Sequence, residues 1–406
     1  MSNYHPLTEA EAVQYARSVP GLFSEGAVLT SREIGDGNLN LVFHIREEGR
    51  EKGVILKQAL PYARVVGESW PLTLDRARIE SEALQVQAKL AEGLVPRVYR
   101  YDPDLALTIM EDLTDHIVMR KGLIARQQYP YFAEHMARFL ARTLFFTSDF
   151  YVDRQEKKEW VRRFLNPQMC DITEGLVFTD PYYDAETNSF NPLIRDEVEA
   201  IWRDDALKRE IAELKEAFMT QAQALVHGDL HTGSIMVTET STKVIDPEFA
   251  YYGPMGFDIG ALFANLLLSY ASHEGHTVDR EVRIAYQEWL LETIETIWNR
   301  FEEQFSALWQ EHVKDEMWRV PGYWERFLSR VLQDSAGFAG CKMLRRVIGL
   351  APVADLETIE DPQVRAEAEV LALHIGQALI NRRKTLETIG QLTAWVREVA
   401  KEKVVK

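Results

Sequence analysis

The first part of the chain has the hydrophobic pattern of a small antiparallel sheet. Short apolar runs rich in β-branched residues predict strands, and they lie at Val28–Ile34, Leu39–Ile45, Val54–Gln58, Val98–Tyr101 and Leu105–Met110. Gly35-Asp36-Gly37-Asn38 separates the first two runs. Its Asp-Gly dipeptide tolerates positive φ at both central positions and therefore predicts a tight hairpin.

Helical spacing of apolar residues dominates the rest of the chain. Thr8-Glu9-Ala10-Glu11 has a capping-box pattern and predicts a short helix at the start, and Arg76–Leu90 predicts another. Longer helical patterns follow at Tyr131–Phe146, Glu197–Ala224, Glu281–Phe305, Phe327–Leu350 and Arg365–Arg383. One apolar hairpin, Ser234–Val237 with Lys243–Ile245, interrupts them. The patterns predict an α+β fold with a small antiparallel β-rich N-terminal lobe and a larger, mainly helical C-terminal lobe.

Composition and charge narrow the classes of partner. The 406 residues include 46 Lys+Arg and 63 Asp+Glu, a net charge of −17. An acidic chain repels the phosphate backbone, so we expect no nucleic-acid partner. The longest apolar stretch, Ala261–Ala271, is too short to cross a bilayer, so we expect no membrane span. The chain has two cysteines and begins without a basic, apolar leader, which predicts a cytoplasmic protein.

The densest group of reactive side chains lies around the predicted hairpin. Val226-His227-Gly228-Asp229-Leu230-His231 precedes it, and Asp246-Pro247-Glu248 follows it. Because a hairpin returns the chain to its starting end, we expect Asp229, Asp246 and Glu248 to converge. Residues two apart in an extended segment point to the same side, so Asp246 and Glu248 are expected to share one cation. Carboxylate oxygens suit Mg²⁺.

The same segment permits a different metal. Alternate residues of an extended chain would present His227, Asp229 and His231 to zinc, which would indicate a metallohydrolase. Such a site usually needs further ligands, and the other histidines are scattered singly along the chain.

The N-terminal lobe offers groups that suit a nucleotide. The Gly35–Asn40 turn brings backbone N–H groups together, although an ordinary hairpin explains it equally well. Lys57 ends an apolar strand, where its ammonium group could hold phosphate oxygens and pair with Glu80 or Glu82. The connector Met110–Leu113 follows a strand, so its backbone could contact an adenine edge.

Together these motifs resemble the protein-kinase-like phosphotransferases that act on small molecules, among them aminoglycoside and choline kinases. More specifically, they resemble the methylthioribose kinase family over nearly the whole length. Further matching segments are Gly67–Thr73, Val226–Ser234, Val244–Ala250 and Phe338–Cys341. The resemblance implies ATP-dependent phosphorylation of S-methyl-5-thioribose at its 1-hydroxyl, a step of methionine salvage, by a homodimer.

The resemblance also implies roles for individual residues. Asp229 would orient the sugar hydroxyl and accept its proton, while Asp246 and Glu248 would hold Mg²⁺. Contacts to ATP would come from Asn38, Asn40, Lys57, Glu80, Glu111, Asp112, Leu113, Asp246, Pro247 and Glu248. Trp70 and the pair Arg345 and Arg346 would contact the sugar together with Asp229. Adjacent helix residues point about 100° apart, so either both arginines or only one of them would reach it. Residues 1–113 would form the ATP-binding lobe, with a hinge at 111–113, and residues 114–406 the catalytic and sugar-binding lobe.

One position departs from the wider superfamily. A metal-binding asparagine usually follows five residues after the catalytic aspartate, and this chain has Ser234 there. The methylthioribose kinase pattern also has serine, so Ser234 discriminates against aminoglycoside and choline kinases. Because a hydroxyl is the weaker ligand, a catalytically silent ATP-binding protein stays an alternative, as does an aminoglycoside- or choline-type kinase.

Overall fold

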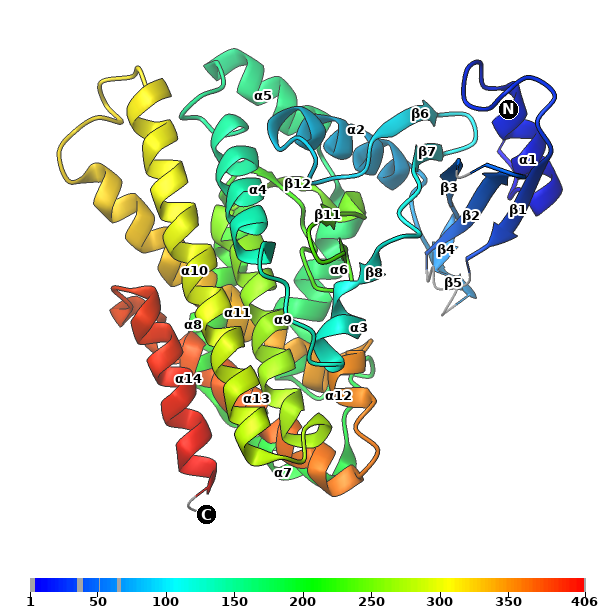
Figure 1. Ribbon diagram of the computed structural model, residues 1–406. Coiled ribbons are helices and arrows are strands. Elements are labelled where there is room, and N and C mark those ends of the chain that lie inside the picture. Colours follow the sequence, from blue (N-terminus) through cyan, green and yellow to red (C-terminus); the bar gives the residue numbers. More distant parts are fainter. Residues whose placement is uncertain (1–3, 35–38, 51, 64–66, 405–406) are drawn as a thin grey trace.

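The computed structural model describes residues 4–34, 39–50, 52–63 and 67–404. A small sheet carries the N-terminal part, and helices form most of the remainder (Figure 1). The predicted α+β arrangement, with a small antiparallel lobe and a larger helical lobe, is confirmed. The predicted hairpin turn at residues 35–38 lies outside the described residues.

The N-terminal sheet contains five strands in the order β1-β2-β3-β7-β6. They are β1 (Leu29–Glu33), β2 (Asn40–Glu47), β3 (Gly53–Ala59), β7 (Leu107–Glu111) and β6 (Val98–Asp102). All neighbours pair antiparallel. Helix α1 (Glu9–Ser18) begins with the predicted capping box, since the backbone N–H of Thr8 donates to Glu11 and that of Glu11 donates to the Thr8 hydroxyl. The sequence therefore identified each of the five strands of this sheet.

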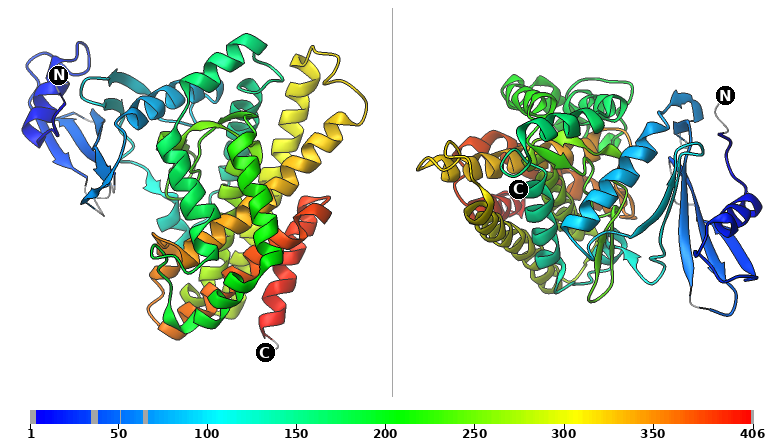
Figure 2. Two further views of the ribbon diagram at one scale, coloured as in Figure 1. Left: turned by 180° about the vertical axis from the view of Figure 1, so that it is seen from behind. Right: turned by 90° about the horizontal axis from the view of Figure 1, so that it is seen from above.

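Helix α2 (Asp75–Leu90) lies between the sheet and the helical lobe (Figure 2). Its buried face, including Ile79 and Ala83, packs against Phe164, Leu225 and Tyr252, which belong to later parts of the chain. The helix thus places its first turns beside both lobes. The preceding segment forms two short strands that the sequence did not predict, β4 (Tyr62–Ala63) and β5 (Gly67–Pro71), which pair with each other.

The helical lobe is built around α9 (Met255–His276), which packs against α10 (Arg280–His312), α11 (Tyr323–Ile348) and α13 (Pro362–Arg382). Helix α9 is long and apolar enough to span a membrane, but its residues from Met255 to His273 are all buried inside the protein, as expected of a core helix. Small residues permit the close packing. A Cβ atom on Gly340 would lie 2.5 Å from the carbonyl oxygen of Gly376, so α11 and α13 approach here as only glycine allows.

The predicted single helix at Glu197–Ala224 is wrong. The chain instead forms α7 (Arg195–Arg203) and α8 (Asp205–Thr220), because Asp204 accepts a hydrogen bond from the Leu207 N–H and caps a new helix. The remaining helices are α3 (Met119–Ile124), α4 (Phe132–Phe146), α5 (Arg154–Arg163), α6 (Pro167–Phe178), α12 (Ala354–Glu357) and α14 (Ile389–Val404), with 3₁₀ turns η1 (Asp180–Tyr182), η2 (Pro192–Ile194), η3 (Pro247–Phe249) and η4 (Arg383–Thr385).

The helical lobe holds more strands than the one predicted hairpin. That hairpin exists as β10 (Ile235–Val237) and β11 (Thr242–Val244), and β8 (Ile117–Val118) adds to it. A second ladder pairs β9 (Ala224–Val226) with β12 (Tyr251–Gly253). The segments 227–234 and 245–250 both run between the two ladders, with Ile235 opposite Val244 and Tyr251 opposite Val226, which holds them side by side. The 3₁₀ turn in the second segment packs against α2, so the predicted reactive residues lie close to the N-terminal part.

Candidate active site

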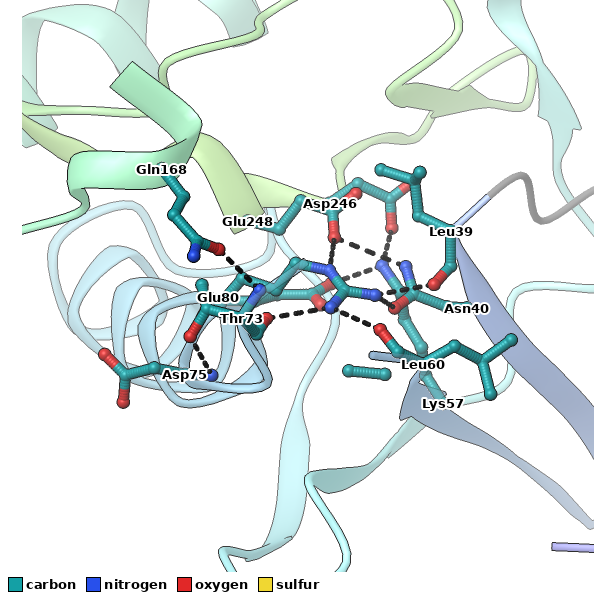
Figure 3. A network of polar contacts seen from close by, with 12 residues as sticks. Leu39, Asn40, Lys57, Leu60, Thr73, Asp75, Glu80, Gln168, Asp246 and Glu248 are labelled. Carbon is teal, nitrogen blue, oxygen red and sulfur yellow. Dashed lines mark hydrogen bonds and ion pairs between the residues drawn. The ribbon is translucent and has the colours of Figure 1, made fainter. Parts of the chain in front are cut away.

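Lys57 joins both halves of the site. From β3, its Nζ lies 2.7 Å from Oε1 of Glu80 on α2 and 2.6 Å from Oδ1 of Asp246 (Figure 3). Burial alone would lower the pKa of Lys57, but Asp246, Glu80 and Glu248 outweigh burial and raise it, so the lysine stays protonated. A buried, permanently charged ammonium group beside two carboxylates is suited to phosphate oxygens.

The structure shows which glutamate pairs with Lys57, a choice between Glu80 and Glu82 that the sequence left open. Glu80 is buried and contacts Lys57. Glu82 instead pairs with Arg78 and Arg163, at 2.9 and 2.7 Å. Burial, opposed by Lys57, raises the pKa of Glu80. The partner of Lys57 is therefore Glu80.

The backbone around Asp246 differs from the extended segment that we expected. Asp246 adopts the left-handed conformation, with φ 62° and ψ 45°, and Pro247–Phe249 forms the 3₁₀ turn η3. Aspartate tolerates this conformation better than most residues. The predicted extended conformation is therefore wrong, yet the tight turn still directs the carboxylates of Asp246 and Glu248 toward the N-terminal lobe (Figure 3).

A buried arginine that the sequence did not reveal holds Glu248. Arg76 has no solvent exposure, and its Nε donates to Oε2 of Glu248 at 3.1 Å. The amide of Asn40 donates to the same oxygen at 3.4 Å. The remaining Arg76 donors bind Asn40 Oδ1 and the carbonyl oxygens of Leu39, Leu60 and Thr73 (Figure 3). Asn40, expected at the nucleotide, thus contacts Arg76 and Glu248. Asn38 and the Trp70 side chain lie outside the described residues.

The pair Asp246 and Glu248 has the donor chemistry of a divalent-cation site. Lys57 contacts only Oδ1 of Asp246, and Arg76 and Asn40 contact only Oε2 of Glu248. Within the described ranges, the second oxygen of each carboxylate makes no hydrogen bond. Two carboxylates are a normal protein contribution to Mg²⁺, which takes its other ligands from water and phosphates. The residues present therefore fit Mg²⁺.

A zinc site receives no support. Nε2 of His227 contacts the carbonyl oxygen of Ile245 at 2.8 Å, whereas Nε2 of His231 lies 3.3 Å from Asp229. No group of three or more His, Cys, Asp or Glu side chains arranged to hold a metal occurs in the part of the chain that the structure describes. The histidines of the segment 227–231 hold the loop.

Asp258 fixes the backbone of this loop. Its carboxylate accepts the backbone N–H groups of His227, at 2.6 Å, and Gly228, at 3.0 Å. Burial raises the pKa of Asp258, with those N–H groups and His227 opposing. Gly228 has φ +82°, and a Cβ there would lie 2.1 Å from the carbonyl oxygen of Phe249. A single acid within the apolar run of α9 was the signal that could have revealed Asp258.

Asp229 emerges from this loop with a lysine beside it. Its Oδ1 accepts from Nζ of Lys342 on α11 at 2.9 Å. Burial would raise the pKa of Asp229, but Lys342, His231 and Arg346 outweigh burial and hold it well below its ordinary value. An ionised carboxylate of this kind can orient a hydroxyl group and accept its proton.

Arg345 and Arg346 follow Lys342 by three and four residues on α11, which places all three on one side of the helix. Both arginines donate to the carbonyl oxygen of Ala351, and Arg345 also to that of Leu350. Burial lowers the pKa of Arg346 to about 9, with Arg345 adding to the effect. The buried Nε of Arg345 has no partner among the described residues. Lys342, Arg345 and Arg346 therefore place a group of positive charges beside Asp229.

The side chains of the predicted hinge already contact other groups of the protein. Glu111 contacts Lys243 at 3.2 Å and the backbone N–H of Arg97 at 3.0 Å. Asp112 contacts His44 at 2.7 Å and the N–H of Thr114 at 2.9 Å. Leu113 is buried. A ligand at this connector would therefore meet backbone groups rather than the two carboxylates.

Fold and site define a phosphotransferase acting on small molecules: residues 30–303 match the APH family, described as the phosphotransferase enzyme family. Within that class, the chain belongs to the methylthioribose kinase family. Methylthioribose kinase from Geobacillus sp. (strain WCH70) is 50% identical over 389 residues, 96% of this chain and 95% of that protein. The enzyme of that name from Bacillus pumilus (strain SAFR-032) is 48% identical and covers 99% of both chains.

Among solved structures, choline kinase from Cryptosporidium parvum Iowa II resembles this chain with a TM-score of 0.48 and 14% identity. The similarity covers 96% of this chain and 99% of that one.

Proposed function

We propose that the protein transfers the γ-phosphoryl group of ATP to the 1-hydroxyl of S-methyl-5-thio-D-ribose, giving ADP and the sugar 1-phosphate. The observation that carries the proposal is the near full-length identity to methylthioribose kinases, 50% over 96% of the chain. The product is an intermediate of methionine salvage. An ATP-dependent enzyme with free cysteines fits the cytoplasm.

We assign ATP binding to the place where the proposed ATP-binding lobe, residues 1–113, meets the proposed catalytic lobe, residues 114–406. Lys57 would keep its bond to Glu80 and exchange Asp246 for phosphate oxygens, since an ammonium group has several rotatable donors. Backbone groups of Glu111–Leu113 would contact the adenine edge. Asn38, and Asn40 at the start of β2, would border the phosphates.

Asp246 and Glu248 are the residues that would hold Mg²⁺, through the oxygens that Lys57 and Arg76 leave unbound. A bound Mg²⁺ would neutralise phosphate charge and align the γ-phosphoryl group. Pro247 sets the turn that places both carboxylates on the same side.

Asp229 would orient the 1-hydroxyl of the sugar toward the γ-phosphorus and accept its proton as the new O–P bond forms and the bond to ADP breaks. Arg345 and Arg346 would bind the sugar hydroxyls, and Trp70 would border the sugar from β5. Positioning and neutralisation of charge supply the catalysis, without a covalent enzyme intermediate.

An ADP-release assay tests the substrate assignment. The purified protein is incubated with MgATP and methylthioribose, ribose, choline, homoserine or an aminoglycoside, and methylthioribose is expected to give the highest kcat/KM. Preference for choline or an aminoglycoside would assign the chain to those kinases. Nucleotide binding without ADP release from any acceptor would indicate a silent ATP-binding protein. Sedimentation of the same preparation tests the homodimer that the family implies.

Asp229→Asn tests the catalytic assignment. The amide keeps the size of the carboxylate but cannot accept the proton, so kcat should fall by roughly 10²- to 10⁴-fold while ATP binding measured by calorimetry stays near wild type. Asp205→Asn is the control, because Asp205 is an exposed aspartate that pairs with Lys208 on the same helix, α8. Unchanged turnover in Asp229→Asn would refute the role of Asp229.

A further inference from the structure

Lys342 is the closest cation to the proposed catalytic carboxylate, and neither the nucleotide nor the sugar assignment uses it. Its Nζ lies 2.9 Å from Oδ1 of Asp229, and its side chain is only 5% exposed. The ammonium nitrogen lies over the ring of Phe257, with Nζ 4.8 Å from the ring centre. Packing therefore gives the ammonium group little freedom to leave the carboxylate.

The two oxygens of Asp229 have unequal partners. The N–H of Gly233 donates to Nδ1 of His231, which makes Nδ1 an acceptor. Burial lowers the pKa of His231 to about 4, so at neutral pH the ring carries its proton on Nε2 and donates to Oδ2 at 3.3 Å. Oδ1 thus has a short, charge-assisted bond, whereas Oδ2 has a longer bond from a neutral donor. Oδ2 is the oxygen that an incoming hydroxyl could engage.

We propose that Lys342 is a positioning residue for phosphoryl transfer: it anchors Oδ1 of Asp229, keeps the carboxylate ionised, and turns Oδ2 toward the acceptor hydroxyl. The inference rests on the proposed function. It differs from a direct role at the phosphoryl group, which would make Lys342 act independently of Asp229.

Other charged groups around Asp229 and Lys342 also act on the pKa values of these two residues, and all of them belong to the site described above. Arg346 and His231 act on Asp229, Arg345 acts on Lys342, and Asp258 on α9 interacts with Lys342. The arginines donate to backbone carbonyl oxygens, and Asp258 accepts backbone N–H groups. Only Lys342 among the cations hydrogen-bonds the carboxylate of Asp229, within the described residues.

A double-mutant cycle tests the proposal. Lys342→Met should lower kcat by roughly 10²-fold, whereas in the Asp229→Asn background the same change should cost less than about threefold, because residues that act as a unit are not additive. Costs that multiply in the double variant would show independent action and overturn the proposal.

The pH profile supplies a readout that a purely structural lysine would not move. A neighbouring cation lowers a carboxyl pKa by about 1 to 3 units, so in Lys342→Met the acid limb of kcat/KM should move to higher pH, and Lys342→Arg should restore most of the limb. An unmoved limb in Lys342→Met would refute the inference.

Lys157→Met is the matched control. Lys157 is also buried, pairs with Asp149 at 2.6 Å and lies 4.8 Å from the centre of the Tyr252 ring, but it does not contact Asp229. Its acid limb should match wild type. The panel of acceptors is tested first with the wild-type protein. Turnover of an acceptor other than methylthioribose would refute only the substrate assignment, and the double-mutant cycle would then be measured with that acceptor. If no acceptor is turned over, both the proposed function and the positioning role of Lys342 are refuted.

Discussion

Arg76 gives the sharpest prediction about what holds the site together. Its guanidinium group is completely buried and faces Glu248, whose side chain is 11% exposed. Replacing Arg76 with methionine preserves most of the volume but leaves the Glu248 carboxylate buried without its cation. Removing one partner of a buried pair costs about 3 to 5 kcal/mol. The carbonyl oxygens of Leu39, Leu60 and Thr73 also lose the hydrogen bonds that Arg76 donates to them.

The free energy of unfolding of Arg76→Met should therefore fall by about 3 to 5 kcal/mol. Urea denaturation followed by tryptophan fluorescence measures the change. Glu248→Gln in the same background removes the stranded charge, so the double variant should recover about 2 kcal/mol relative to the sum of the single costs.

Arg78→Met is the control, because Arg78 lies two residues further along α2 and its side chain is 28% exposed. Its ion pairs with Asp75 and Glu82 are near the surface, and such pairs contribute about 0 to 1 kcal/mol. A loss below about 1 kcal/mol in Arg76→Met, or costs that simply add in the double variant, would refute the reasoning.

Two further predictions concern the backbone and acid sensitivity. Gly228→Ala should abolish most activity, because its Cβ would collide with Phe249. Gly93→Ala is the control: Gly93 has φ +81° with nothing within 4 Å of the added Cβ, so this variant should lose only about 1 to 2 kcal/mol of stability. Equal effects of the two substitutions in activity and denaturation assays would contradict this prediction. Burial lowers the pKa of His273 from 6.5 to about 4. The unfolded chain then binds a proton that the folded protein excludes, so stability should fall as pH falls from about 6.5 to about 4. Denaturation should show a shallower fall for His273→Gln; an equal slope would exclude His273 as a cause.

The N-terminal lobe was predictable because the strands of its sheet are short apolar runs and its first helix has a capping box. Helical periodicity could not locate the end of α7, since Asp204 continues the polar pattern while starting a new cap. The three-residue strands β9 and β12 are too short for alternation to be visible. Local patterns therefore predicted the β10–β11 hairpin but missed the β9–β12 ladder, which helps to position the reactive loops.

The candidate site was predictable to the extent that its residues carry motifs. Asp229, Asp246 and Lys57 were found from spacing and resemblance, and the structure adds their partners. Lys342 had a signal, since it precedes Arg345 and Arg346 by one helical turn. Arg76 had none, because nothing local marks an arginine on an ordinary helix as buried. Its partner Glu248 lies far along the chain, and only folding brings the two together.

The buried helix α9 has a consequence for how the chain folds during synthesis. Its partners α11 and α13 follow it in the sequence and end only at Ile348 and Arg382. At roughly 5 to 20 residues per second, α9 waits on the order of ten seconds before its packing partners leave the ribosome. During that interval an apolar segment resembling a membrane span is uncovered. The emerging chain should therefore depend on chaperones until α13 is complete, and truncation before α11 should yield an aggregating product.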